Sequence, residues 1–155
     1  MPKIDIAAIK PRKGSGYPVP FHEIAKARLK KSLGDAAGLS DFGVNLVTLP
    51  PGAWSSQRHW HSAEDELVYL LSGELVLVTD GGEEVLRAGD CAAFAKGVAD
   101  GHHLINRSDG DAVYLEVGSR RPDDACSYPD IDLMLGGGDG QFRRRDGTPY
   151  PPRQG

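Results

Sequence analysis

Short apolar segments recur at regular intervals between residues 43 and 119, and this spacing constrains the fold more than any other feature. The segments read GVNLVTL, ELVYLL, ELVLVT, EEVLR, CAAFA, HHLIN and DAVYLEVGS. Val, Leu and Tyr fill most of them, and Gly, Pro, Asp or Ser closes them. Runs of this kind are typical of β-strands, and short strands at such spacing indicate an all-β barrel or sandwich.

The chain of 155 residues suits a single domain that can bury a core without disulfides. We expect three parts: an N-terminal arm and packing segment over 1–42, a barrel over 43–119, and a C-terminal tail over 120–155. The stretch PRKGSGYPVP predicts an extended arm rather than a packed element, whereas FHEIAKARLKKSL fits a helix or a strand equally well. The tail has no sustained period, so we expect it to be irregular and to pack on the barrel or on a partner subunit.

The charge balance argues against a nucleic-acid-binding protein. Lys and Arg number 18 against 22 Asp and Glu, which gives a net charge of −4. The basic residues Lys26, Arg28, Lys30 and Lys31 most simply form a solvated face, and the triplet Arg143–Arg145 is most simply exposed. We therefore expect a small-molecule ligand and no nucleic-acid partner.

Two separated cysteines, Cys91 and Cys126, do not form a disulfide framework, and Cys91 reads as a small buried hydrophobe. The N-terminal sequence is too polar for a signal peptide, and no apolar run approaches the roughly 18 residues of a membrane span. These observations predict a cytoplasmic protein without membrane association.

Histidine spacing gives the strongest chemical signal. His59 and His61 are separated by one residue, so on a strand both imidazoles point to one face, and Glu66 follows after a short turn. His102 and His103 lie on a later strand, where only one of the two can point inward, and periodicity does not choose between them. Imidazole and carboxylate together suit Zn, Fe, Mn or Ni.

The sequence resembles the cupin family, a group of small jelly-roll β-barrels. The segment from Gly52 to Gly73 resembles the first cupin motif, G(x)5HxH(x)3,4E(x)6G, with one extra residue before the first histidine. The segment from Gly89 to Asn106 resembles the second motif, G(x)5PxG(x)2H(x)3N, with Ala95 in place of proline and two extra residues before the histidine.

The resemblance implies one divalent metal ion inside the barrel. Its ligands would be three histidines and one glutamate, and the H(x)3N spacing selects His102 over His103. The four ligands implied are His59, His61, Glu66 and His102. An ion with an open coordination position can polarise a carbonyl, lower the pKa of a water or activate dioxygen.

The reaction is not readable from the sequence. We expect a metal-dependent enzyme of isomerase, lyase or dioxygenase type, acting on a sugar derivative, a keto acid or an aromatic acid. The alternative is a non-catalytic binding or sensing module that works through a protein partner. No catalytic acid or base stands out. Glu116 could be a pocket acid, although an exposed charge is more common on a strand. Gln57 could line the pocket, and Tyr69 falls on the face opposite Glu66. A homodimer is expected, partly from the resemblance.

Overall fold

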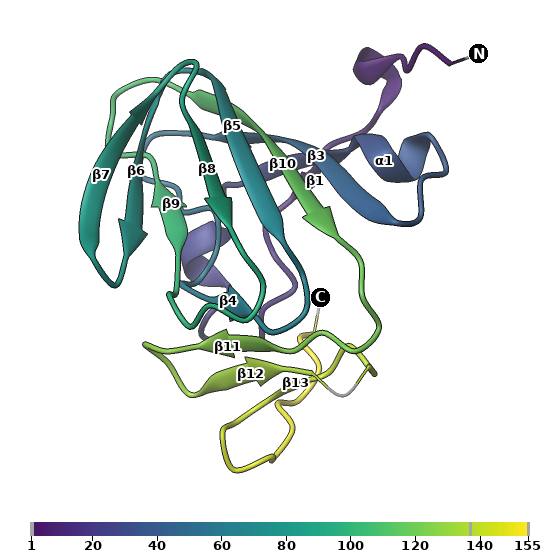
Figure 1. The fold of residues 1–155 in the computed structure, drawn as a ribbon, viewed down its shortest axis with the longest axis vertical. Helices are drawn as coiled ribbons and strands as arrows, with labels where there is room; N and C mark the ends of the chain where they lie inside the picture. Colours follow the sequence, from purple (N-terminus) through teal and green to yellow (C-terminus); the bar gives the residue numbers. More distant parts are fainter. Residues whose placement is uncertain (1, 137, 155) are drawn as a thin grey trace.

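The computed structural model describes residues 2–136 and 138–154 and consists mainly of short strands (Figure 1). In chain order the elements are η1 Ile6–Ala8, β1 Arg12–Lys13, η2 Glu23–Ala25, β2 Leu29–Ser32, α1 Leu33–Ala36, β3 Phe42–Leu49, β4 Trp60–His61, β5 Glu66–Ser72, β6 Glu74–Thr79, β7 Gly82–Arg87, β8 Cys91–Phe94, β9 His103–Ile105, β10 Ala112–Ser119, β11 Cys126–Tyr128, β12 Leu133–Leu135 and β13 Phe142–Arg143. No helix in the described part of the chain has the length and apolar character needed to cross a membrane.

Three antiparallel sheets make up the molecule. Six strands pair in the order β1-β2-β3-β10-β5-β8, and three pair in the order β7-β6-β9. The third sheet, β13-β12-β11-β4, lies across one end of the other two (Figure 1). The predicted all-β fold is confirmed, although the sheets are not joined into a closed barrel.

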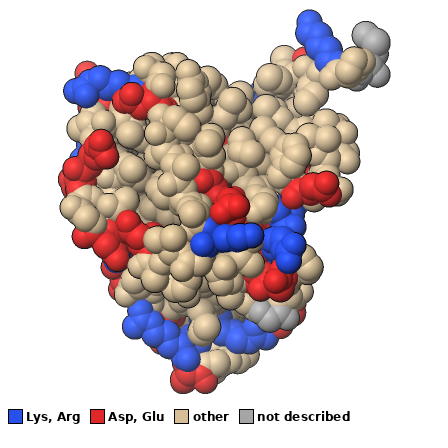
Figure 2. All heavy atoms as spheres, viewed as in Figure 1, with Lys and Arg blue, Asp and Glu red and all other residues tan. Residues whose placement is uncertain are grey.

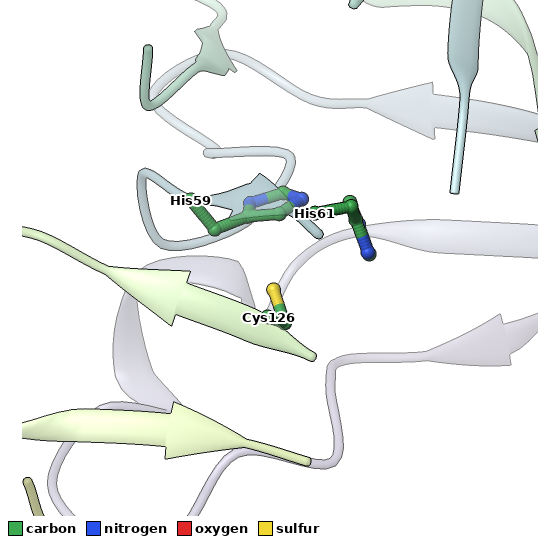
Figure 3. A group of neighbouring side chains, drawn as sticks. All are labelled: His59, His61 and Cys126. Carbon is green, nitrogen blue, oxygen red and sulfur yellow. The ribbon is translucent and has the colours of Figure 1, made fainter. Parts of the chain in front are cut away.

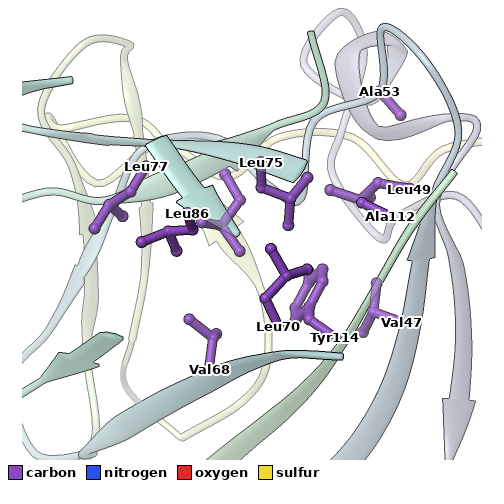
Figure 4. Packing of buried hydrophobic residues seen from close by; sticks show 11 residues of the cluster. Val47, Leu49, Ala53, Val68, Leu70, Leu75, Leu77, Leu86, Ala112 and Tyr114 are labelled. Atoms are coloured by element: carbon purple, nitrogen blue, oxygen red, sulfur yellow. The ribbon is translucent and has the colours of Figure 1, made fainter. Parts of the chain in front are cut away.

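The main core lies between the six-stranded and three-stranded sheets (Figure 4). Strand alternation sends Val68 and Leu70 of β5 into it, where they meet Leu75 of β6 and Tyr114 of β10. Tyr114 is only 1% exposed. This apolar core fills one end of the space between the two sheets. The polar side chains that point into this space lie toward its other end.

Two expectations for the chain ends are wrong. Tyr17, in the stretch expected to be an unpacked arm, is buried and packs on Tyr128 and Phe142 with ring centroids 5.7 and 5.6 Å apart. The ambiguous segment that follows forms the short helix η2 and then strand β2. The tail is not irregular, because β11 to β13 pair with one another and with β4. Strands of two or three residues are too short to show a period in the sequence.

The prediction that Cys91 is buried is also wrong. Cys91 is exposed, because alternation on β8 turns its neighbours Ala92 and Phe94 inward instead. Cys126 is buried, and both cysteines are free. Tyr69 lies opposite Glu66 as predicted, but its side chain is 41% exposed and is not covered by this chain.

The turn between β5 and β6 depends on a glycine. Gly73 has φ +81°, and a Cβ added there would lie 2.5 Å from the Asp111 carbonyl oxygen and 2.8 Å from Ala112 Cα. We expect Gly73→Ala to destabilise the fold by about 3 kcal/mol or more, since backbone strain and a steric clash add. Gly52 is a matched control: it has φ +82° but open space at the Cβ position, so Gly52→Ala should cost about 1 kcal/mol. Equal midpoints of thermal unfolding for the two variants would contradict this account.

Candidate metal centre

Three imidazoles converge on the carboxylate of Glu66, the first residue of β5. The Oε2 atom of Glu66 lies 2.7 Å from His102 Nε2 and 3.6 Å from His59 Nε2. The Oε1 atom lies 3.3 Å from His61 Nε2. All three histidines therefore present the same ring nitrogen to one carboxylate, and the four predicted ligands lie together.

Backbone pairing aligns these side chains. His59 and His102 form an isolated antiparallel bridge, in which each backbone N–H donates to the other residue's carbonyl at 3.2 and 2.9 Å. Directly paired residues share a face, so the two imidazoles point the same way. His61 lies two residues further on, with its ring centroid 5.1 Å from that of His59. Glu66 reaches them because the chain turns back between β4 and β5.

The outer ring nitrogens of two histidines have their own partners. His61 Nδ1 lies 2.7 Å from Asp124 Oδ2, and His59 Nδ1 lies 2.8 Å from the Gln57 carbonyl oxygen. A partner that accepts the Nδ1 proton leaves Nε2 free to bind a metal. Asp124 was missed in the sequence because it lies in the tail, where no pattern marked it.

Cys126 also lies beside this cluster, as Figure 3 shows for His59, His61 and the Cys126 sulfur. It pairs with His61 across β11 and β4, and the ligand atoms of the three residues lie within 4.8 Å of one another. Burial raises the pKa of the Cys126 thiol to about 12, so the group is a neutral thiol at physiological pH. No pattern in the sequence indicated this contact.

The charges of the cluster stabilise one another. Burial disfavours a charged His61, but the carboxylates of Glu66 and Asp124 outweigh burial and raise the pKa of the imidazole to about 9. Burial likewise disfavours an ionised Glu66, yet hydrogen bonds from His102, His59 and His61 hold its pKa far below the ordinary value. Without a metal, the Glu66 carboxylate therefore accepts hydrogen bonds from the surrounding imidazoles, and a divalent ion would replace the protons that those nitrogens carry.

His102 and His103, the first residue of β9, face opposite sides. His102 stacks on Phe94 with ring centroids 3.5 Å apart and contacts Glu66. His103 packs against Trp54 at 4.6 Å, and burial lowers its pKa to about 4. His103 is thus a buried, neutral packing residue on the far side from Glu66, and the structure places His102 beside the other three predicted ligands.

A second set of possible ligands overlaps the first. Among the described residues, His61, Glu64 and Asp124 also place their ligand atoms within 4.8 Å of one another. Asp124 is already engaged, because its Oδ1 accepts a hydrogen bond from the Ala63 backbone at 2.8 Å. Glu64 Oε1 accepts one from the Arg121 backbone at 2.8 Å. Glu66 is held only by imidazoles, which makes it the freer carboxylate.

A cavity of about 380 Å³ opens beside the cluster, between the six-stranded sheet and the segments that carry the histidines. Gly118 pairs with Glu66 and Gly43 pairs with Gly118 in the same cross-strand row, so two positions of this row carry no side chain beside the carboxylate. The next row inward carries Ser32, Asn45 and Glu116, with Asn45 donating to Glu116 at 3.4 Å. Glu116 therefore lines the cavity, as the sequence had suggested for a pocket acid.

The suggestion that Gln57 lines the pocket is wrong. Its side chain is 8% exposed and donates to the Phe21 carbonyl oxygen at 3.0 Å. The backbone N–H of Gln57 also donates to the Tyr17 hydroxyl at 3.3 Å. Gln57 thus joins the N-terminal segment to the strand that carries the histidines.

Comparisons with known proteins agree with this architecture. Residues 45–118 match the family described as the Cupin domain. A crystal structure from Silicibacter pomeroyi, described as a sugar phosphate isomerase from a cupin superfamily, is 46% identical, covers 97% of each chain and gives a TM-score of 0.91. No curated protein matches the chain.

Two further solved structures are more distant. A proposed sugar phosphate isomerase from Acidithiobacillus ferrooxidans is 33% identical over 76% of this chain and 74% of that chain, with a TM-score of 0.71. A protein from Thermotoga maritima, predicted to be an oxalate decarboxylase, is 22% identical over 77% of this chain and 99% of that chain, with a TM-score of 0.62. At that identity the last similarity supports the fold alone.

Proposed function

Because the chain belongs to the cupin superfamily, we propose that it is a metal-dependent isomerase of a small sugar derivative. The observation that carries this proposal is the convergence of three imidazole nitrogens and one carboxylate at the wall of a cavity. Support for isomerase chemistry comes from the two solved relatives whose descriptions name sugar phosphate isomerases.

His59, His61, Glu66 and His102 would hold the ion, since their donor set suits a divalent first-row metal. Such an ion, when bound, supplies a Lewis acid for a substrate hydroxyl or carbonyl oxygen. Asp124 and the Gln57 carbonyl would keep two of the imidazoles oriented.

Glu116 is the carboxylate that we assign to proton transfer. It lines the cavity one row inward from Glu66 and forms no ion pair among the described residues. An aldose–ketose isomerisation moves a proton from one carbon to its neighbour and a second proton between the two oxygens, so no atom is gained or lost. A carboxylate that faces the substrate can accept the carbon-bound proton and return it to the neighbouring carbon.

The test begins with protein purified without an affinity tag or chelator, whose metals are measured by inductively coupled plasma mass spectrometry. We expect about one equivalent of a divalent ion and interconversion of aldose and ketose phosphates that stops on chelation and returns when the ion is added back. Metal binding without turnover of any sugar derivative would leave a binding module as the better account. Failure to bind any divalent ion would refute the metal-centre proposal.

We also infer that the protein is a homodimer joined through the outer face of its six-stranded sheet. Outward residues on the four strands β3, β10, β5 and β8 are uncharged and mainly apolar: Phe42, Val44, Leu46, Thr48, Val113, Leu115, Val117, Leu67, Tyr69, Leu71, Cys91 and Ala93. In the view of Figure 2, uncharged atoms cover the region over β5, β8 and β10, and charged groups lie mainly around it. A contiguous apolar face of this kind marks an interaction surface.

A second copy is the partner that fits this face best. The N-terminal arm, here the segment that precedes β1, projects from the body (Figure 1). Its Ile6 carbonyl accepts a hydrogen bond at 2.9 Å from Lys31, which points outward from β2. The arm therefore lies next to the apolar face, where it can reach over a second copy. An uncharged face also pairs with itself without burying an unmatched charge.

We expect Leu67→Glu to halve the mass measured by light scattering at micromolar concentration. Leu67 is 38% exposed at the centre of the face, and a dimer would bury the new carboxylate without a partner. Val85→Glu is the control, because Val85 is 41% exposed on β7, outside this face. A monomeric wild type, or a Leu67→Glu protein that keeps its mass, would refute the interface.

A further inference from the structure

The basic run of the sequence does not form one solvated face. Three residues of β2 and of the stretch just before it point inward and line the cavity: Arg28, Lys30 and Ser32. Lys31 points outward and donates a hydrogen bond to the Ile6 carbonyl oxygen. Register sets this alternation: Lys30 pairs with Val47 and Ser32 with Asn45, and both partners belong to the inner face of β3. The sequence interpretation is therefore wrong for Arg28 and Lys30.

Lys30 is the cation of the cavity that has no partner. Among the described residues its ammonium forms no hydrogen bond and no ion pair within 4.0 Å. Arg120 pairs with Asp35, and Arg28 donates to the carbonyls of Ser55 at 2.7 Å and Gly14 at 3.2 Å. Burial lowers the pKa of Lys30, and the charge of nearby Glu116 opposes that effect. The amine is therefore partly shielded from solvent and close to that carboxylate.

The Tyr114 hydroxyl is a second hydrogen-bond donor without a partner in the described part of the chain, and it lies in the same cross-strand row as Lys30. Tyr114 shares this row with Val47 and hence with Lys30, and it lines the cavity. Its hydroxyl is fully buried and makes no hydrogen bond of normal geometry among the described residues. Burial keeps the pKa of Tyr114 far above its usual value, so the group remains a proton donor. The Arg28 Nε–H is a third buried donor without a partner.

These donors are separated from the metal-ligand cluster by one row of the sheet. Glu66 belongs to the row of Gly43 and Gly118, Glu116 to the next, and Lys30 and Tyr114 to the one after that. A molecule of a few carbons that reaches from Glu66 to Lys30 passes Glu116 on the way. Buried donors that lack acceptors are costly unless a ligand supplies the acceptors.

We propose that Lys30, Tyr114 and Arg28 form an anion subsite that binds the phosphate or carboxylate end of the substrate, while its other end faces the metal-ligand cluster. The role of this subsite rests on the proposed function, because the subsite would determine which sugar derivatives bind. Phosphate and carboxylate both offer the oxygen acceptors that the three donors lack. Glu116 faces the same space, and its negative charge weakens the site for an anion.

Isothermal titration of the metal-loaded protein tests the subsite with ribose 5-phosphate, ribonate, inorganic phosphate and uncharged ribose. We expect Lys30→Gln to weaken binding of the charged probes by about 10- to 100-fold, the range for one lost charged hydrogen bond, and to leave ribose unchanged. Lys30→Arg should retain most of the affinity. Glu116→Gln should change affinity in the opposite direction, because it removes a repelling charge.

Lys31→Gln is the matched control, since Lys31 lies on the same strand but on its outer face. Which probe binds more tightly distinguishes a phosphate subsite from a carboxylate subsite. Equal affinity of Lys30→Gln and wild type, or a wild type that binds none of the charged probes at millimolar concentration, would overturn the proposal. Metal content measured on the same samples distinguishes failure of the subsite from failure of the metal centre. A protein that binds no metal refutes the proposed function, whereas titration with inorganic phosphate still tests the role of Lys30.

Discussion

Replacing Glu66 by glutamine is expected to lower the affinity for a divalent ion by more than the 10- to 100-fold seen when an outer partner of a ligand is lost. Among the residues that the structure describes, this carboxylate alone contacts all three imidazoles, and its pKa is held far below the ordinary value. Glutamine keeps the size of the side chain but removes the charge, so the variant should fold and should be purified with less than one equivalent of metal. Turnover should fall in proportion to the metal lost.

Glu64→Gln is the matched control for this experiment. Glu64 is two residues away, and its Oε2 lies 3.7 Å from His61 Nδ1, on the outer side of that ring. If the ion is bound at the Nε2 side, Glu64→Gln should change metal content by less than Glu66→Gln. Larger metal loss in Glu64→Gln would instead favour the set formed by His61, Glu64 and Asp124. Mass spectrometry of both variants, purified side by side, distinguishes the two centres.

The strand pattern was readable because one face of each strand is buried. Along β5 the alternation of Val68 and Leu70 with exposed Leu67 and Tyr69 reflects a sheet with two different faces. The same period placed His59 and His61 on one side. Local spacing therefore made His59, His61 and Glu66 predictable. His102 is distant from them in the sequence, and it was predicted from the motif resemblance.

The groups missed by the sequence analysis come from long-range pairing. Asp124 and Cys126 approach His61 only because β11 pairs with β4, and the tail has no local signal for that pairing. Lys30 was misread for a related reason: a run of charges looks solvated until the register of β2 against β3 is known. A shift of one residue would exchange Lys30 with Lys31 between cavity and surface.

Replacing Asn106 by leucine is expected to be the most destabilising of these substitutions, at about 4 kcal/mol. Asn106 is 0% exposed, and its Nδ2 donates to the carbonyls of Leu49 at 2.7 Å and Gly110 at 2.8 Å. Its Oδ1 accepts from the Ser108 backbone at 2.9 Å and from the Ser108 hydroxyl at 2.7 Å. Leucine has a similar size but leaves these partners without a hydrogen bond inside the protein.

The midpoint of thermal unfolding should fall by about 10 °C for Asn106→Leu, since 1 kcal/mol shifts a domain of this size by about 2–4 °C. Ser108→Ala is the control, because it removes the hydroxyl but leaves both amide donations in place, and it should cost about 1 kcal/mol. Asn106→Asp should lie between the two: it preserves the acceptor for Ser108 but turns an oxygen toward two carbonyls. A midpoint for Asn106→Leu no lower than that of Ser108→Ala would show that the motif asparagine does not hold the loop before β10 to the end of β3.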